Sequence, residues 1–191
     1  MPPKSSAKLY TGKELSFFQT LINTPSPTGF EYMGNHVWLD YIKQYVDETF
    51  VDPYGTAVGV INPKAEFKLV LEAHCDEISR YVKYITDDGL LYVLRNGGSD
   101  HQIAPSKRVH IHTSDGKTLK GLFGRPAIHT RRDGKEQAPE KDNIFIDVGC
   151  TSKKEVEKLG IEVGNVITYE DEFITLNNRY YVGRAMDNKA G

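Results

Sequence analysis

The sequence predicts an α/β fold that is interrupted by an inserted all-β domain. Two segments with helical periodicity and several short strands come before residue 78. Between residues 78 and 175 most apolar residues alternate with polar ones, which is typical of β-strands. A further strand then leads to Asp187. Because a β-rich block separates two parts of an α/β pattern, we expect residues 1–77 and 176–191 to form one domain and residues 78–175 to form the other.

Two helices are expected near the N-terminus. Each begins with Thr-x-x-Glu spacing, at Thr11–Glu14 and at Thr28–Glu31. This spacing allows the two side chains to satisfy free backbone N–H groups at the start of a helix. Pro25 and Pro27 separate the two segments, since proline cannot continue a helix. Apolar residues recur at steps of three and four in both, and we expect the second helix to extend over Thr28–Glu48.

The strands expected in the first domain differ in their burial. Residues 48–62 indicate two short strands around a Pro-Gly turn. Leu69–Leu71 form a continuous apolar run, which is typical of a strand buried on both faces of an α/β sheet.

The inserted block carries its own turn and helix signals. Asp-Gly pairs at residues 88–89 and 115–116 each separate two alternating segments and predict two hairpins. The Gly-, Lys- and Glu-rich residues 131–142 predict a loop. A third capping box, Ser152–Glu155, predicts a short helix that ends at Gly160.

The composition limits the classes of function. The net charge of −2 argues against a general nucleic-acid-binding protein, which carries a basic patch. No apolar run approaches the roughly 20 residues of a membrane span, and the N-terminal residues lack the apolar core of a signal peptide. Cys75 and Cys150 are expected to be buried, unpaired thiols in a reducing compartment. These features predict a cytoplasmic protein.

His74 and Asp76 are the first candidates for chemistry. They stand two residues apart at the end of the predicted buried strand, so both side chains are expected on one side of it. Ligands bind at strand ends in open α/β sheets, and a carboxylate beside an imidazole fixes its tautomer for metal binding. A structural histidine, satisfied by its neighbours, is the alternative for His74.

Asp187 is the second candidate. It follows a predicted strand and precedes a run of small residues suited to the start of a helix. The alternative is that Asp187 is only a helix N-cap. His110 and His112 share one face of a predicted strand and could bind a metal. No third ligand lies near them in the sequence, so we interpret them as part of a solvated strand face.

Taken together, these segments resemble the M42 metallo-aminopeptidases. The similarity runs through nearly the whole chain, in order. It includes NTPSPTGFE, VDPYGTAVGV, AHCDEI, IFIDVGCTSKKEVEKLGIEVGNVITY and GRAMDNKAG, of which the fourth is the most specific. The chain departs from the family pattern at Thr56, where Asn is usual, and at Asn188 and Lys189, where Asp and Arg are usual.

The resemblance implies a role for each matching site residue. His74 is expected to be a ligand of one metal ion, and Asp76 is expected to orient its imidazole. Asp187 is expected to bridge two divalent ions, zinc or cobalt. The implied fold is a mixed-sheet, zinc-peptidase-like α/β catalytic domain with the inserted β domain, and the implied protein is a homo-oligomer that cleaves peptide substrates.

In this family the general-base Glu and the remaining metal ligands lie beyond the Asp187 motif. The resemblance therefore implies that residues 1–191 are the first part of a longer enzyme and that the catalytic domain is incomplete within them. Two alternatives remain open. One is a glycoside hydrolase, prompted by an old cellulase label in the family, although that chemistry leaves His74 without a role. The other is a catalytically inactive assembly module.

Overall fold

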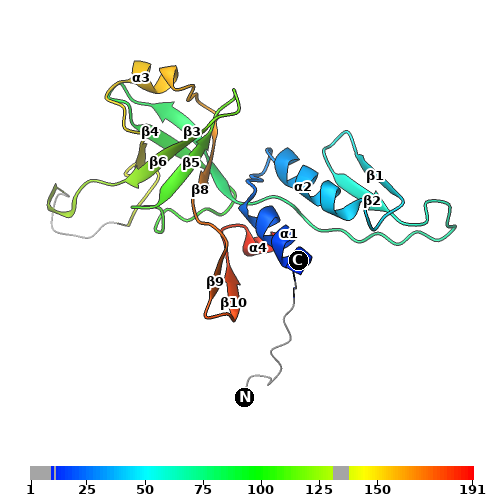
Figure 1. Ribbon diagram of the computed structural model, residues 1–191. Coiled ribbons are helices and arrows are strands. Elements are labelled where there is room, and N and C mark those ends of the chain that lie inside the picture. Colours follow the sequence, from blue (N-terminus) through cyan, green and yellow to red (C-terminus); the bar gives the residue numbers. More distant parts are fainter. Residues whose placement is uncertain (1–9, 11, 131–137) are drawn as a thin grey trace. The chain divides into compact units, whose positions relative to one another are not determined.

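A computed structural model describes residue 10 and residues 12–130 and 138–191 of the chain (Figure 1). The chain divides into two compact units. One comprises Met1–Ser26, Glu31–Cys75 and Glu172–Gly191, and the other comprises Pro27–Phe30 and Asp76–Asp171. We call them the α/β unit and the barrel unit, and we describe each by itself.

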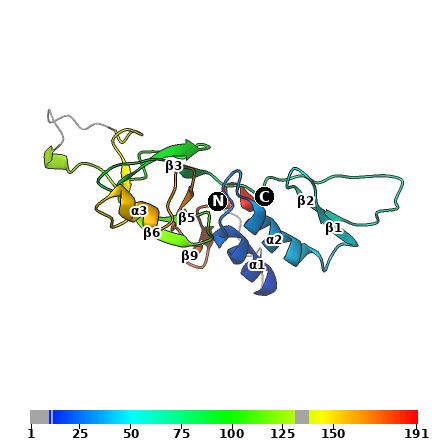
Figure 2. The ribbon, with the colours of Figure 1, turned by 90° about the horizontal axis from the view of Figure 1, so that it is seen from above.

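The α/β unit contains two adjacent helices. Helix α1 (Gly12–Asn23) and helix α2 (Tyr32–Ile42) lie side by side, and the rings of Phe17 and Tyr41 stack with centroids 3.8 Å apart (Figure 2). Helix α2 closely approaches the preceding loop. A Cβ on Gly34 would lie 2.0 Å from Ser26 Oγ, so only glycine fits at this position.

The second helix is shorter than the sequence predicts. Glu31 is the N-cap of α2 and makes no side-chain capping hydrogen bond, so the capping box predicted at Thr28–Glu31 is wrong. The helix ends at Ile42 rather than at Glu48. The cap predicted at Thr11 lies outside the described residues, whereas the helix predicted after it is confirmed as α1.

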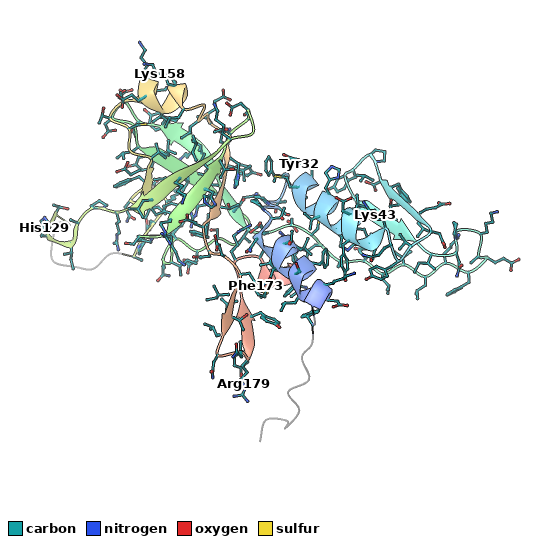
Figure 3. The ribbon with its side chains drawn as sticks, viewed as in Figure 1. Tyr32, Lys43, His129, Lys158, Phe173 and Arg179 are labelled. Carbon is teal, nitrogen blue, oxygen red and sulfur yellow. The ribbon has the colours of Figure 1, made fainter. Side chains whose placement is uncertain are left out.

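Two hairpins complete the α/β unit. The first joins β1 (Glu48–Val51) to β2 (Ala57–Val60), as the sequence predicts. The second joins β9 (Ile174–Leu176) to β10 (Tyr180–Val182) and leads into the short helix α4 (Met186–Lys189). Phe173, labelled in Figure 3, packs edge-to-face on Phe18 of α1. Phe18, Ile22 and Phe173 form the small core of this unit.

The barrel unit is built around a closed antiparallel barrel of six strands in the order β3-β4-β7-β6-β5-β8. Closure pairs the first strand with the last and leaves no free edge. The strands are β3 (Ser79–Ile85), β4 (Leu91–Asn96), β5 (Arg108–His112), β6 (Thr118–Gly124), β7 (Phe145–Asp147) and β8 (Val166–Tyr169).

A glycine at each turn allows the two predicted hairpins of the barrel to form. The β3–β4 and β5–β6 connections turn at Gly89 and Gly116, whose φ angles are +87° and +82°. Glycine adopts such angles at little cost, so both hairpin predictions are confirmed. A single 3₁₀ turn, η1 (Ile128–Thr130), follows β6, and residues 131–137 of the predicted loop lie outside the described residues.

Successive side chains of a barrel strand point alternately to the interior and to the surface of the barrel. Val109 and Ile111 are fully buried, whereas the intervening His110 is half-buried. The barrel core comprises Val82, Ile85, Leu91, Val93, Ala104, Val109, Ile111, Phe123, Ile144, Ile146, Val156, Ile161 and Ile167.

Helix α3 (Lys153–Lys158) belongs to the barrel unit and has the predicted cap. The Ser152 side chain accepts from the backbone N–H of Glu155 at 3.3 Å. Gly160, at φ +89°, ends the helix, and Ile161 N–H reaches back to the Val156 carbonyl at 3.4 Å. Val156 and Ile161 join the barrel core, whereas Lys158 points away from the barrel (Figure 3). Among the helices in the described part of the chain, none is long and apolar enough to cross a membrane.

Candidate metal site

His74 lies in an extended segment that the sequence wrongly predicts to be a buried strand. Leu69, Val70 and Leu71 are 76%, 79% and 90% exposed, and no strand is assigned within residues 61–78. The His74 side chain is exposed as well. Burial of such a strand requires neighbouring strands on both sides and covering helices, and within the described residues none of these lies over the apolar run.

Asp76 follows two residues later and belongs to the barrel unit. Its carboxylate is half-buried, and Thr28 Oγ1 donates a hydrogen bond to its Oδ2 at 2.5 Å. The Thr28–Glu31 spacing predicts a helix cap at Thr28, so the sequence does not indicate this contact. The NTPSPTGFE motif includes Thr28 but does not indicate its partner, which is 48 residues away in the sequence.

Asp187 lies within α4, and its side chain is exposed. The backbone of Asp187 is not helical, with φ −97° and ψ 103°, so the assigned N-cap at Ala185 does not decide between the metal-ligand and N-cap interpretations of Asp187. Helix α4 is short, and the contacts that hold it come from the residues around Asp187.

Two basic residues beside Asp187 hold this segment against the end of α1. Lys189 is 9% exposed, and its Nζ donates to the carbonyl oxygens of Leu21 at 3.1 Å and Thr24 at 2.8 Å. Arg184 Nη2 donates to the carbonyl oxygen of Asn23 at 3.1 Å. The last carbonyls of a helix have no intrahelical donor and carry partial negative charge, which cations stabilise. Because α1 has no basic residue in its own last turn, Lys189 and Arg184 provide these cations.

The sequence predicts both histidines of β5 on a solvated face, but His112 is buried and His110 is half-buried. His112 is 8% exposed, with its Nε2 3.0 Å from Thr168 Oγ1, and its ring centroid is 6.0 Å from that of Phe30. His110 Nε2 is 3.6 Å from Glu170 Oε1. Both histidines therefore contact residues that are distant in sequence, and His112 is buried by them.

The Glu170 carboxylate near His110 is paired with two basic side chains. Lys120 Nζ and Arg108 Nε each lie within 2.9 Å of a Glu170 carboxylate oxygen. The Lys120 hydrogen bond and the positive charges of Arg108, Lys120 and His110 hold the pKa of Glu170 below its ordinary value, although partial burial opposes this. This arrangement is an ion-pair network on the barrel surface, and nothing in it indicates a metal ligand set.

His74 and Asp187 belong to the same compact unit, whereas Asp76 belongs to the other. An imidazole and a carboxylate are donors that zinc and cobalt accept, so the two proposed ligands fit divalent ions by type. Within residue 10 and residues 12–130 and 138–191, no three His, Cys, Asp or Glu side chains converge as a metal-binding group. The convergence of His74 and Asp187 stays a prediction.

Both cysteines are free thiols, as predicted, but they are half-buried rather than buried. Cys150 follows the strand β7, and burial raises the pKa of its thiol, with further contributions from the carboxylates of Glu155 and Asp147. A raised pKa keeps the thiol protonated at neutral pH and lowers its reactivity.

Comparison with known proteins connects these residues to one family. The family model for M42 glutamyl aminopeptidase matches residues 55–191, which include His74, Asp76 and Asp187. The chain is 31% identical to FrvX of Escherichia coli (strain K12), over 93% of this chain and 50% of that protein. It is 27% identical to the lysyl aminopeptidase of Pyrococcus furiosus, over 88% of this chain and 49% of that protein. The chain thus spans about half the length of the curated relatives it matches.

Solved structures give the same result for the fold. The TET aminopeptidase from the marine sediment archaeon Thaumarchaeota archaeon SCGC AB-539-E09 is similar with a TM-score of 0.80 and 28% identity, over 86% of this chain and 46% of that chain. The TET1 peptidase of Pyrococcus horikoshii, which can assemble into a tetrahedron or a large octahedral shell, is similar with a TM-score of 0.75 and 26% identity, over 91% of this chain and 52% of that chain. These structures support a peptidase-like fold, and with the family match over residues 55–191 they show that the chain belongs to the M42 glutamyl aminopeptidase family.

Proposed function

We propose that the full-length protein is a two-metal aminopeptidase that hydrolyses the N-terminal residue from peptides. The observation that carries the proposal is the family match over residues 55–191, which spans both proposed metal ligands. The relatives described above favour an aminopeptidase over a glycoside hydrolase, because their names and the family description refer to peptide substrates. His74 then has a role that carboxylate-only glycoside hydrolysis does not give it.

The site residues have separate proposed roles. His74 and Asp187 would hold the two metal ions, zinc or cobalt. Asp76 would orient the His74 imidazole and so fix which ring nitrogen is left for the metal. Divalent ions at such a site supply Lewis acidity, which polarises a peptide carbonyl and lowers the pKa of water. We place the general-base Glu and the remaining ligands in the part of the enzyme that corresponds to the unmatched half of the relatives.

The arrangement of domains follows from the same proposal. The barrel strands lie within residues 78–175, the range that we assign to the inserted domain. Residues 1–77 and 176–191 then contribute to the catalytic domain. We propose a homo-oligomer for the full-length enzyme, supported by the assemblies described for the Pyrococcus horikoshii relative. A cytoplasmic location is supported by the two free thiols.

The preferred N-terminal residue does not follow from family membership, because matching relatives carry names as different as lysyl and glutamyl aminopeptidase. The test of function therefore uses a panel of aminoacyl-nitroanilides. The full-length protein is expressed from its complete coding sequence, freed of metal with a chelator and reloaded with zinc or cobalt. Light scattering on the same sample gives the oligomeric state.

Matched variants connect activity to the proposed ligands. We expect His74→Ala and Asp187→Asn to abolish metal-dependent turnover, and His36→Ala and Asp142→Asn, which alter exposed side chains of the same types, to retain it. Turnover of a soluble cellulose derivative in place of the nitroanilides would favour the glycoside hydrolase alternative. A full-length protein that binds no metal and turns over neither substrate would favour the assembly module.

A further inference from the structure

The residues just before α2, Pro27–Phe30, belong to the barrel unit and are held there by backbone hydrogen bonds. Pro27 pairs with Glu77 in a parallel β-bridge, and Thr28 N–H donates to the Glu77 carbonyl at 3.3 Å. Thr28 Oγ1 also donates a hydrogen bond to Oδ2 of Asp76, the residue that precedes Glu77, at 2.5 Å.

Side chains from two barrel strands donate hydrogen bonds to the backbone carbonyl of Thr28. Its carbonyl oxygen accepts from the Tyr81 hydroxyl of β3 at 2.7 Å and from Asn96 Nδ2 of β4 at 2.9 Å. The next residue, Gly29, has a φ of +85°, and a Cβ there would lie 3.4 Å from the Tyr81 hydroxyl. The Thr28 backbone is therefore fixed by paired strands, and its hydroxyl is presented to Asp76 from a defined position.

A carboxylate that orients an imidazole has to be oriented itself. The Asp76 side chain has two rotatable bonds, and its two oxygens together accept about four hydrogen bonds. A donor fixed on Oδ2 favours one rotamer of the Asp76 carboxylate. Mutation of a group that hydrogen-bonds a metal-ligating histidine, the role proposed for Asp76, commonly costs about 10–100-fold in metal affinity.

We propose that Thr28 is a positioning residue for the metal site, acting through Asp76. Its hydroxyl holds the carboxylate that orients His74, and Tyr81 and Asn96 fix the backbone from which the hydroxyl is presented. This inference rests on the proposed function. It adds to that function a residue of the barrel unit that positions Asp76.

The test measures metal affinity in the full-length enzyme rather than turnover alone. Metal-free protein is titrated with cobalt, and binding is followed by the visible absorption of the ion and by calorimetry. We expect Thr28→Val, which replaces the hydroxyl with a methyl group of similar size, to weaken the affinity about tenfold. Thr28→Ser keeps the hydroxyl and should retain affinity within about twofold of wild type. Thr20→Val is the matched control, because the Thr20 hydroxyl donates only to the Ser16 carbonyl within α1.

A double-mutant cycle shows whether the effect passes through Asp76. In an Asp76→Ala background, Thr28→Val should cause no further loss of affinity, because the carboxylate it positions is gone. A further loss in that background, or affinity of Thr28→Ser as low as that of Thr28→Val, would overturn the inference. Wild-type affinity in Thr28→Val would also overturn it, while leaving the proposed function intact if His74→Ala abolishes binding. If His74→Ala binds cobalt like wild type, the proposed function itself fails.

Discussion

The buried ammonium group of Lys189 offers a direct test of what holds the Asp187 segment in place. Replacing Lys189 by Met keeps the apolar stem but removes the charge and both hydrogen bonds, to the carbonyls of Leu21 and Thr24. Each hydrogen bond from a charged donor contributes about 1.5–3 kcal/mol. Leu21 and Thr24 are half-buried, so in the variant water can hydrogen-bond their carbonyl oxygens and restore part of this free energy. We therefore expect the variant to lose about 2–3 kcal/mol of stability in this part of the fold.

Hydrogen–deuterium exchange measures this loss locally. One factor of ten in an equilibrium corresponds to about 1.4 kcal/mol, so opening of the segment should become roughly 30- to 150-fold more frequent in Lys189→Met. Good reporters are the Phe173 amide, which donates to Asn23 Oδ1 at 2.8 Å, and the Thr24 amide, which donates to the Thr20 carbonyl at 2.9 Å. Amides of the barrel unit serve as an internal reference.

Two further variants complete the experiment. Lys189→Arg keeps the positive charge and should preserve most of the protection. Lys64→Met removes an exposed lysine of the same unit and should change the free energy of unfolding by less than about 0.5 kcal/mol. Unchanged protection of the α1 end and of Phe173 in Lys189→Met would refute the idea that this lysine anchors the segment.

Two predictions concern the barrel unit. Ser152→Ala removes the acceptor for the Glu155 N–H and should destabilise α3 by about 1 kcal/mol, measured by urea unfolding with Thr151→Ala as a comparison that leaves this bond intact. The pKa of Asp115 is lowered from 3.8 to about 2, mainly by a hydrogen bond from the Lys117 side chain and secondly by one from the Thr113 hydroxyl. Because the folded-state pKa is depressed, the stabilisation is complete above pH 3.8 and is lost as the pH falls toward 2. Lys117→Met should raise the pKa of Asp115, and carboxyl ¹³C NMR would contradict this if the titration midpoint stayed near 2.

The parts of the fold that the sequence predicts correctly depend on local interactions. The hairpins at Gly89 and Gly116 follow from turns that only a few residues determine, and the start and end of α3 follow from Ser152 and Gly160. In each case the partner groups lie within five residues, so the pattern is present in any short window of the sequence. Helix α1 is predicted for the same reason, from the spacing of its own apolar residues.

The predictions that are wrong depend on partners elsewhere in the chain. Leu69–Leu71 have the composition of a buried strand, but burial is a property of neighbouring elements, and this run is exposed. Thr28 has the spacing of a helix cap, but its hydroxyl donates to Asp76 instead. His112 lies on the outer face of β5, and its burial follows from the approach of Phe30. No local pattern in the sequence contains these partners.

The same limit applies to the candidate site, where the segment between α1 and α2 has a role that periodicity could not reveal. In the α/β unit, its carbonyls at Asn23 and Thr24 accept from Arg184 and Lys189, the basic residues on either side of Asp187. In the barrel unit, Thr28 donates to Asp76. One stretch of six residues thus contacts the surroundings of both proposed site carboxylates. Pro25 and Pro27 lie inside this stretch and restrict its backbone. Each unit thereby holds the surroundings of its own proposed site carboxylate through this stretch, although Asp76 and Asp187 are 111 positions apart in the sequence.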